Sequence, residues 1–258
     1  MDAENLFPAE RTAVITGAAS ARGIGRATAD RLARDGWSIA ILDVDEEGAK
    51  RTAAKIAGNR SVAALGVVAD VADEGSVEAA IAQVEAALPP IIGLANVAGV
   101  SSAIDFLDLT LAEWDRVFDI NMRGVFLVTR RVVPAMLAAG VGRIVSVSSV
   151  SAQRGGGTYS KVPYSASKAA IIGFTRALAR EMGPYGITVN SVAPGPIDTD
   201  IMGGTLTEER KAELGAANMV GRVGTVDEVA ALMAFLLGED AGHITAATYD
   251  INGGLHVS

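Results

Sequence analysis

Apolar residues along this chain fall into short continuous runs, separated by longer stretches in which apolar positions recur with a helical period. The runs are rich in Val, Ile and Ala and do not alternate with polar residues, which is typical of strands buried on both faces of a parallel sheet. They predict strands at residues 13–16, 39–43, 62–68, 91–96, 143–147 and 187–192. The periodic stretches predict helices at residues 25–35, 46–56, 76–87, 111–139 and 164–182.

This regular alternation of strands and helices is the pattern of βαβ units. Two helix starts have capping-box form, Thr110 with Glu113 and Thr225 with Glu228. The longest segment without strongly β-rich character is residues 194–225, and we expect it to be mobile. Because nothing resembles a linker or a repeat, we expect residues 1–258 to form one three-layer αβα domain.

Composition excludes several classes of protein. Half of the 258 residues are hydrophobic, so the chain can bury a large core and is not intrinsically disordered. The absence of cysteine removes disulfides, thiolate zinc sites and a cysteine nucleophile, and two histidines leave little for a metal site, so we expect no metal. A net charge of −8 argues against a nucleic-acid partner, which would require a basic footprint.

Neither a secretory signal nor a membrane span is expected. The first ten residues carry Asp2, Glu4 and Glu10 and lack an apolar core. No apolar run approaches the length needed to span a bilayer. These features predict a soluble cytoplasmic protein without a membrane partner.

A glycine-rich turn follows the first predicted strand. The chain reads Thr16-Gly17-Ala-Ala-Ser-Ala-Arg22-Gly23-Ile24-Gly25 and then enters a helix. Glycines there allow a tight turn and let backbone N–H groups approach a pyrophosphate at the helix N-terminus. The spacing differs from the general dinucleotide fingerprint, so on spacing alone a simple glycine-rich turn is an equal interpretation.

Asp43, at the end of the second strand and 20 residues beyond Gly23, strengthens the dinucleotide hypothesis. A carboxylate there can accept hydrogen bonds from both hydroxyls of an adenosine ribose, and it would repel a 2′-phosphate. It favours NAD(H) over NADP(H). Arg22 points the other way, because a basic residue in this loop could meet that phosphate, so NADP(H) stays possible.

Tyr164 and Lys168 are four residues apart on a predicted helix and therefore share a face. A free tyrosine ionises near pH ~10, and an adjacent ammonium favours its phenolate. Alone this pair is a weak signal, because such pairs occur by chance in many helices.

Taken together and in this order, the motifs resemble those of the classical short-chain dehydrogenase/reductase family. The resemblance runs along nearly the whole chain and implies a doubly wound, mostly parallel seven-stranded Rossmann fold. It rests on residues 16–25, Asp43, Asp70-Val71, Asn96-Val-Ala-Gly99, Asn121, Ser148-Ser149, Tyr164 with Lys168, and Pro194-Gly195-Pro-Ile197-Asp-Thr199.

The resemblance implies a role for each catalytic residue. Tyr164 would be the general acid in reduction and the base in oxidation. Lys168 would hold the nicotinamide ribose and lower the pKa of Tyr164, and Ser149 would hydrogen-bond the substrate oxygen. Asn121 would lie where its helix is distorted and bind a water that links Lys168 to solvent.

The resemblance also implies a cofactor site, and we expect a substrate pocket beside it. For two members another interpretation is open: Asp70 as a solvated loop carboxylate, and Asn96 as a brace within the sheet. The cofactor residues would be Gly17, Arg22, Gly23, Ile24, Gly25, Asp43, Asp70, Val71, Asn96, Ala98, Gly99, Tyr164, Lys168, Pro194, Gly195, Ile197 and Thr199. The expected pocket residues are Ser101, Gln153, Tyr159, Pro196 and Met202.

The chain also departs from the family pattern. Five residues separate Gly17 from Gly23 where the family usually has three, so the pyrophosphate contacts of residues 18–22 stay unassigned. Tyr164 follows Ser149 by 15 positions, which makes the loop at residues 155–161 longer than usual. Ala246 stands where glycine is customary, a change that we expect to be related to packing.

We therefore expect an NAD(H)-dependent enzyme that interconverts a secondary alcohol and a ketone, with residues 194–225 closing over a small-molecule substrate. The resemblance further implies a homotetramer. The alternative within enzymes is a 3-oxoacyl thioester reductase that uses NADPH. The alternative from another class is a sensor that binds the dinucleotide without chemistry. A nucleotide-sugar epimerase or dehydratase shares the Tyr/Lys pair, but usually carries a longer C-terminal substrate domain.

Overall fold

Seven parallel strands form the centre of the molecule in the computed structural model, which describes residues 7–202 and 204–257. The order across the sheet is β3-β2-β1-β4-β5-β6-β7, and all six strand pairings are parallel. The expected doubly wound Rossmann sheet is confirmed, and it is parallel throughout. The strands are β1 (Thr12–Thr16), β2 (Ser38–Asp43), β3 (Ala64–Val68), β4 (Ile91–Asn96), β5 (Gly142–Val147), β6 (Ile187–Pro194) and β7 (Thr248–Ile251).

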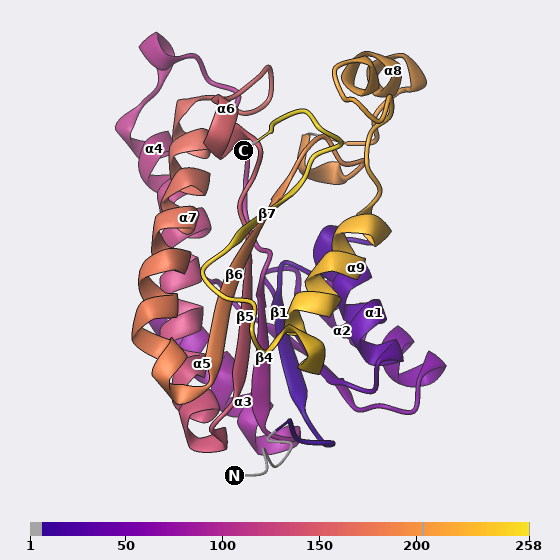
Figure 1. Cartoon of the computed structure of the whole chain (residues 1–258), viewed down its shortest axis with the longest axis vertical. Helices are drawn as coiled ribbons and strands as arrows, with labels where there is room; N and C mark the ends of the chain where they lie inside the picture. Colours follow the sequence, from indigo (N-terminus) through magenta and orange to yellow (C-terminus); the bar gives the residue numbers. More distant parts are fainter. Residues whose placement is uncertain (1–6, 203, 258) are drawn as a thin grey trace.

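Helices cover both faces of the sheet, which gives the three layers seen in Figure 1. One layer consists of α1 (Ile24–Arg34), α2 (Glu46–Asn59) and α9 (Val226–Leu237). The other consists of α3 (Glu74–Ala87), α4 (Leu111–Phe118), α5 (Gly124–Ala139) and α7 (Val162–Met182). Two further helices, α6 (Ser151–Arg154) and α8 (Glu208–Ala216), lie at the end of the molecule where the strands finish. Among the described residues no helix has both the length and the apolar character that crossing a membrane requires.

The continuous apolar runs are explained by two separate cores, one on each face of the sheet. Successive side chains of a strand point to opposite faces. Accordingly Ala13 and Ile15 of β1 pack into one core with α1 and α9, whereas Val14 packs into the other with α3 and α5. Every residue of β1, β4, β5 and β6 is buried.

The predicted helix at residues 111–139 is interrupted. Its first part is α4, its last part is α5, and Asp119–Arg123 between them is a π-helix. Wider turns of this kind are frequent at functional sites. The expectation that Asn121 lies in a locally distorted helix is therefore confirmed.

The break at residues 194–225 contains more regular structure than its composition indicated. It holds a short 3-10 helix at Asp200–Met202 and the helix α8, and Ile197 forms an isolated parallel bridge with Gly224. At its end Thr225 and Glu228 form the predicted capping box in full. The other predicted box is half formed, because Thr110 accepts from the Glu113 backbone N–H while the Glu113 carboxylate pairs with Arg116.

Ala246 has a backbone conformation that ordinarily favours glycine. Its φ is 61°, which makes it the one non-glycine residue with positive φ in the described part of the chain. Its backbone N–H donates to the Val189 carbonyl at 2.8 Å, which holds it beside β6. A left-handed conformation costs an L-residue roughly 1–2 kcal/mol. Ala246 also packs against one of the two cores, which agrees with the expected packing-related change.

Candidate functional site

A cavity of about 870 Å³ opens where the strands end, which is where α/β sheets bind ligands. It gathers most of the residues predicted from the sequence. Those that line it are Gly17, Gly23, Ile24, Asp43, Asp70, Val71, Ala98, Gly99, Ser101, Ser149, Tyr159, Tyr164, Lys168, Pro194, Gly195, Pro196, Ile197 and Thr199. Arg22, Gly25, Asn96, Asn121 and Gln153 are not part of its wall.

The glycine loop (residues 17–25) forms a cradle that side chains would fill. Gly17 has a φ of +68°, and a Cβ on it would lie 2.6 Å from the Ala98 Cα. A Cβ on Gly25 would lie 2.5 Å from the Gly17 carbonyl oxygen. Gly23 precedes α1 without a side-chain cap, so no side chain competes for the first N–H groups of this helix. A close backbone approach beside the positive end of a helix fits the pyrophosphate of a dinucleotide.

Asp43 lies at the carboxyl end of β2, as the sequence indicated, and it also braces the glycine loop. Its Oδ2 accepts a hydrogen bond from the Ala19 backbone N–H at 2.9 Å, and its Oδ1 accepts from the Asp45 N–H at 3.1 Å. The carboxylate therefore faces the cavity from a fixed position. Its charge makes this end of the cleft unfavourable for a phosphate.

Two further predictions about the cofactor site have different outcomes. Asp70 and Val71 line the cavity, with Asp70 exposed and Val71 buried. Asn96 lies inside the sheet, where its Nδ2 donates to the Thr129 hydroxyl at 3.1 Å and to the Ser146 hydroxyl at 3.2 Å. Of the two interpretations of Asn96, the brace within the sheet is the one that these contacts support.

Ser149, Tyr164 and Lys168 meet on the floor of the cavity. Ser149 follows β5, while Tyr164 and Lys168 come from the first two turns of α7. All three are buried, and the Ser149 hydroxyl lies close enough to the Tyr164 side chain to lower its pKa. Lys168 donates from Nζ to the Val147 carbonyl at 2.7 Å, and this nitrogen lies 5.8 Å from the centre of the Tyr164 ring. The strand ends therefore fix both the serine and the lysine against the tyrosine.

Burial dominates the ionisation of the tyrosine and the lysine. It raises the pKa of Tyr164 above the ordinary value, and the hydrogen bond from Ser149 offsets only part of this. It also lowers the pKa of Lys168 to about 8. The expected lowering of the tyrosine pKa by Lys168 is not found in the free protein, because both charged forms lose solvation in the same buried place.

Asn121 holds the backbone beside this floor. Its Oδ1 accepts from the Val100 N–H at 2.8 Å, and its Nδ2 donates to the Val100 carbonyl and the Ser167 hydroxyl, each at 3.0 Å. A Cβ on Gly99 would lie 3.1 Å from Asn121 Oδ1 and 3.3 Å from Lys168 Nζ. Glycine at position 99 thus leaves room for both side chains. The water that would link Lys168 to solvent stays a prediction.

The expected substrate pocket is only partly assembled. Ser101 and Tyr159 line the cavity, and the Ser101 hydroxyl donates to the Tyr159 carbonyl. Gln153 instead donates to Asp250 of β7 at 2.7 Å. Met202 ends the 3-10 helix at Asp200–Met202, and its side chain lies outside the described part of the structure. Arg154 also lines the cavity and makes no ion pair with any described residue.

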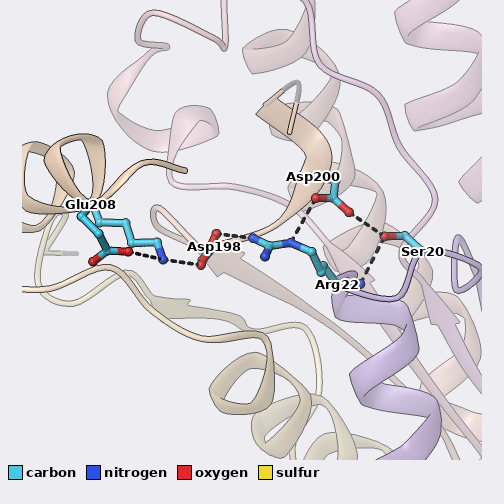
Figure 2. Close-up of polar contacts among 6 residues, drawn as sticks. Ser20, Arg22, Asp198, Asp200 and Glu208 are labelled. Carbon is cyan, nitrogen blue, oxygen red and sulfur yellow. Dashed lines mark hydrogen bonds and ion pairs between the residues drawn. The ribbon is translucent and has the colours of Figure 1, made fainter. Parts of the chain in front are cut away.

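Sequence reasoning singled out Arg22 and Tyr159 but missed the contacts by which they close the rim of the cavity. Arg22 forms ion pairs with Asp198 and Asp200, and the guanidinium of Arg210 lies 5.4 Å from the centre of the Tyr159 ring (Figure 2 shows the first contact). The stretch Ile197-Asp-Thr-Asp200 holds the one signal that the sequence offered, because two acidic residues stand next to two residues expected at the cofactor.

Comparisons with known proteins agree with this geometry. Residues 17–256 match the family described as enoyl-(acyl carrier protein) reductase. An uncharacterized short-chain type dehydrogenase/reductase of Sinorhizobium fredii is 41% identical over 245 residues, covering 95% of this chain and 97% of that protein. A 3-oxoacyl-[acyl-carrier-protein] reductase of Aquifex aeolicus is 38% identical over 245 residues, with the same coverage of 95% and 97%. Levodione reductase of Leifsonia aquatica is 38% identical over 254 residues, covering 95% of this chain and 94% of that one.

The fold, the site and these relatives define a class: the chain belongs to the short-chain dehydrogenase/reductase family. It is an oxidoreductase of a family that binds a nicotinamide dinucleotide and acts on small molecules. In the described residues no cluster of three or more His, Cys, Asp or Glu side chains is arranged to hold a metal ion.

Proposed function

We propose that this protein transfers a hydride between NAD(H) and a secondary alcohol or ketone, with Tyr164 as the general acid and base. The observation that carries the proposal is that the buried side chains of Ser149, Tyr164 and Lys168 meet in a cleft whose other end is the glycine cradle. A phenol and a hydroxyl that meet in one cavity can both hydrogen-bond a single substrate oxygen.

The chain's own groups divide the reaction between them. In reduction the Tyr164 phenol donates its proton to the substrate oxygen, and the Ser149 hydroxyl stabilises the charge that develops there. In oxidation Tyr164 takes the proton back. The dinucleotide, when bound, supplies or accepts the hydride. Lys168 holds the nicotinamide ribose, and Asn121 keeps the adjoining backbone in place.

NAD(H) is the proposed cofactor because the adenosine end of the cleft is acidic. Asp43 and Asp70 both line it. Arg22, the one cation of the glycine loop, is already paired with Asp198 and Asp200, so it does not offset that charge. A 2′-phosphate there would meet uncompensated carboxylates.

A fluorescence titration with NADH and with NADPH tests the cofactor. We expect tighter binding of NADH, and we expect Asp43→Asn to narrow the difference by about tenfold, or about 1.4 kcal/mol. The amide oxygen can still accept from Ala19, so the loop keeps its support. Tighter NADPH binding by the unaltered protein would overturn the choice of NAD(H).

The second candidate is a 3-oxoacyl thioester reductase that uses NADPH, and the names of relatives favour it. Besides the Aquifex protein, a 3-oxoacyl-[acyl-carrier-protein] reductase of Escherichia coli is 34% identical over 247 residues, covering 96% of this chain and 98% of that one. A panel that sets secondary alcohols and ketones against 3-oxoacyl thioesters separates the two. Turnover restricted to thioesters with NADPH would replace the first proposal by the second.

A dinucleotide-binding sensor without chemistry is the alternative from another class. It has no use for a buried tyrosine and lysine that meet a serine in the cleft, and this argues against it. Cofactor binding without turnover across the whole panel would favour the sensor.

We further propose a single-domain cytoplasmic enzyme that forms a homotetramer, with residues 194–225 as a lid. Apolar side chains stay exposed on two helices, namely Phe126 and Leu137 of α5 and Phe235 of α9, and are available for contacts between subunits. Light scattering coupled to size-exclusion chromatography should give four times the chain mass.

A further inference from the structure

The glycine loop reaches across the cleft and binds the segment that follows β6. Arg22 Nη2 lies 2.6 Å from Asp198 Oδ1, and Arg22 Nε lies 3.1 Å from Asp200 Oδ1. Ser20 adds a hydrogen bond from its hydroxyl to Asp200 Oδ2 at 3.1 Å. Figure 2 shows these three contacts, which run from the glycine loop to the two carboxylates at the start of the predicted lid.

Asp198 is held from its other side as well. Lys211 of α8 contacts Asp198 Oδ2 at 2.9 Å and Glu208 at 3.0 Å. The hydrogen bond from Lys211, together with the nearby Arg22, lowers the pKa of the Asp198 carboxyl. One carboxylate therefore joins the glycine loop, the start of the lid and helix α8 in a continuous chain (Figure 2).

The residues next to these carboxylates face the cleft. Ile197 and Thr199 are each 6% exposed and line the cavity. Ile197 forms a parallel bridge with Gly224, whose carbonyl accepts from the Asp198 N–H at 3.3 Å, and the chain bends at Asp198 and Thr199 before the 3-10 helix. Because Asp198 and Asp200 are the chain neighbours of Thr199, a grip on both carboxylates limits the positions that Thr199 can take.

We propose that Arg22 is a positioning residue, which clasps Asp198 and Asp200 and thereby holds Ile197 and Thr199 against the cofactor end of the cleft. It does not act as a ligand of a cofactor phosphate. Ser20 and Arg22, which reach Asp198 and Asp200, both lie in the stretch between Gly17 and Gly23 that is two residues longer than the family pattern. The effect on turnover rests on the proposed function, whereas the clasp itself does not.

The clasp is reversible because it is exposed to solvent. The side chains of Arg22, Asp198 and Asp200 are 39%, 25% and 43% exposed. Exposed ion pairs are weak and are screened by salt. This suits a contact that must open to admit a dinucleotide and then close over it.

Hydrogen exchange of the free protein tests the clasp without cofactor or substrate. We expect the amides of residues 197–202 to exchange about 2- to 30-fold faster in Arg22→Gln, because two exposed ion pairs are lost. Asp198→Asn/Asp200→Asn should give at least this increase, since it also removes the Lys211 contact, and adding Arg22→Gln to it in a triple variant should change nothing further, because Arg22 acts through these two carboxylates. Lys211→Gln removes only the contact from α8 to Asp198, and its exchange rates measure how much that contact slows exchange.

Arg34→Gln is the matched control, since Arg34 is an exposed arginine of α1 that pairs only with Asp30. It should leave exchange at residues 197–202 unchanged. Unchanged exchange in Arg22→Gln would overturn the clasp, and so would additive effects in the triple variant. A protein that exchanges as expected but turns over no substrate would contradict the proposed function alone.

Kinetics then separate a positioning role from a phosphate ligand. If Arg22 positions the lid, Arg22→Gln and the double aspartate variant lower kcat alike, Arg22→Lys recovers part of the loss, and the preference between NADH and NADPH is unchanged. If Arg22 binds a phosphate, its loss weakens NADPH more than NADH, while the aspartate variants strengthen NADPH binding. That second outcome would overturn the proposal.

Discussion

The floor of the cleft and its rim are built from different interactions. The floor, formed by Ser149, Tyr164 and Lys168 with Asn121 beside it, is buried, and its hydrogen bonds run to neighbouring side chains or to backbone groups of β5 and of the stretch after β4. The rim, formed by the glycine loop, residues 155–161 and residues 194–225, has more exposed residues than buried ones. Its cross-cleft contacts include the ion pairs of Arg22 and the stacking of Arg210 on Tyr159.

The difference follows from what each region must do. Breaking a buried hydrogen bond leaves a buried polar group unpaired, which costs about 1–3 kcal/mol of stability. Such hydrogen bonds therefore keep the reacting groups in one geometry. Exposed ion pairs contribute about 0–1 kcal/mol each and exchange readily with water. A rigid floor below a weakly held rim lets ligands enter without disturbing the chemistry. Variants of the floor should therefore have much larger effects than variants of the rim.

Tyr164→Phe is expected to have the largest effect. The ring and its packing are kept, but the proton donor and the partner of Ser149 are lost. Turnover should fall by about 10²- to 10⁴-fold, the usual contribution of a general acid or base. NADH titration is the control and should give the same affinity as the unaltered protein. Undiminished turnover would show that the floor does not hold the acid and base.

The pH dependence should be opposite in sign for the two directions. Burial raises the pKa of Tyr164, so its proton-bearing form persists through neutral pH and reduction stays constant until the phenol ionises in the alkaline range. Oxidation requires the phenolate, whose fraction below the pKa grows by about tenfold for each pH unit. Measuring kcat/KM in both directions from neutral to alkaline pH checks this. An oxidation rate that does not rise would mean that another group is the base.

Gly99→Ala probes how tightly the floor is packed. The new methyl group would press on Asn121 Oδ1 and Lys168 Nζ, at 3.1 and 3.3 Å. We expect kcat to fall by about tenfold, because small misplacements of catalytic groups are costly. Gly173→Ala in α7 is the matched control, since its methyl group meets open space. It should keep full activity and gain up to about 1 kcal/mol of stability. Equal activity of the two variants would show that the floor is looser than its contacts indicate.

The floor was more accessible to prediction from the sequence than the rim. Tyr164 and Lys168 share a helical face by their spacing, and the strands can be read from the runs because each face of the sheet has its own core. The π-helix at Asn121 is also where the sequence indicated a distortion. Local periodicity and strand ends determine these positions, so a linear pattern contains them.

The rim depends on contacts between residues that are far apart in the chain. Arg22 and Asp198 are separated by 176 positions, and no spacing rule connects them. Helix α8 was missed because residues 208–216 read as a charged surface stretch within a segment without strands. The Asn96 side chain points into the sheet because it donates a hydrogen bond to Thr129, which comes from α5 and is 33 positions away.

Tyr159→Ala should have the smallest effect and completes the comparison between floor and rim. Tyr159 is 37% exposed, and its ring supports Arg210 at 5.4 Å, a contact worth about 0.5–1 kcal/mol at an exposed site. Its loss should raise the KM for the substrate by about two- to fivefold and leave kcat unchanged, because the ring is part of the cleft's wall and not of the reacting set. Tyr159→Phe keeps the ring and is expected to match the unaltered protein. If Tyr159→Ala instead lowered kcat as strongly as Gly99→Ala, this part of the rim would belong to the catalytic machinery, and the division between a rigid floor and a loosely held rim would fail at that point.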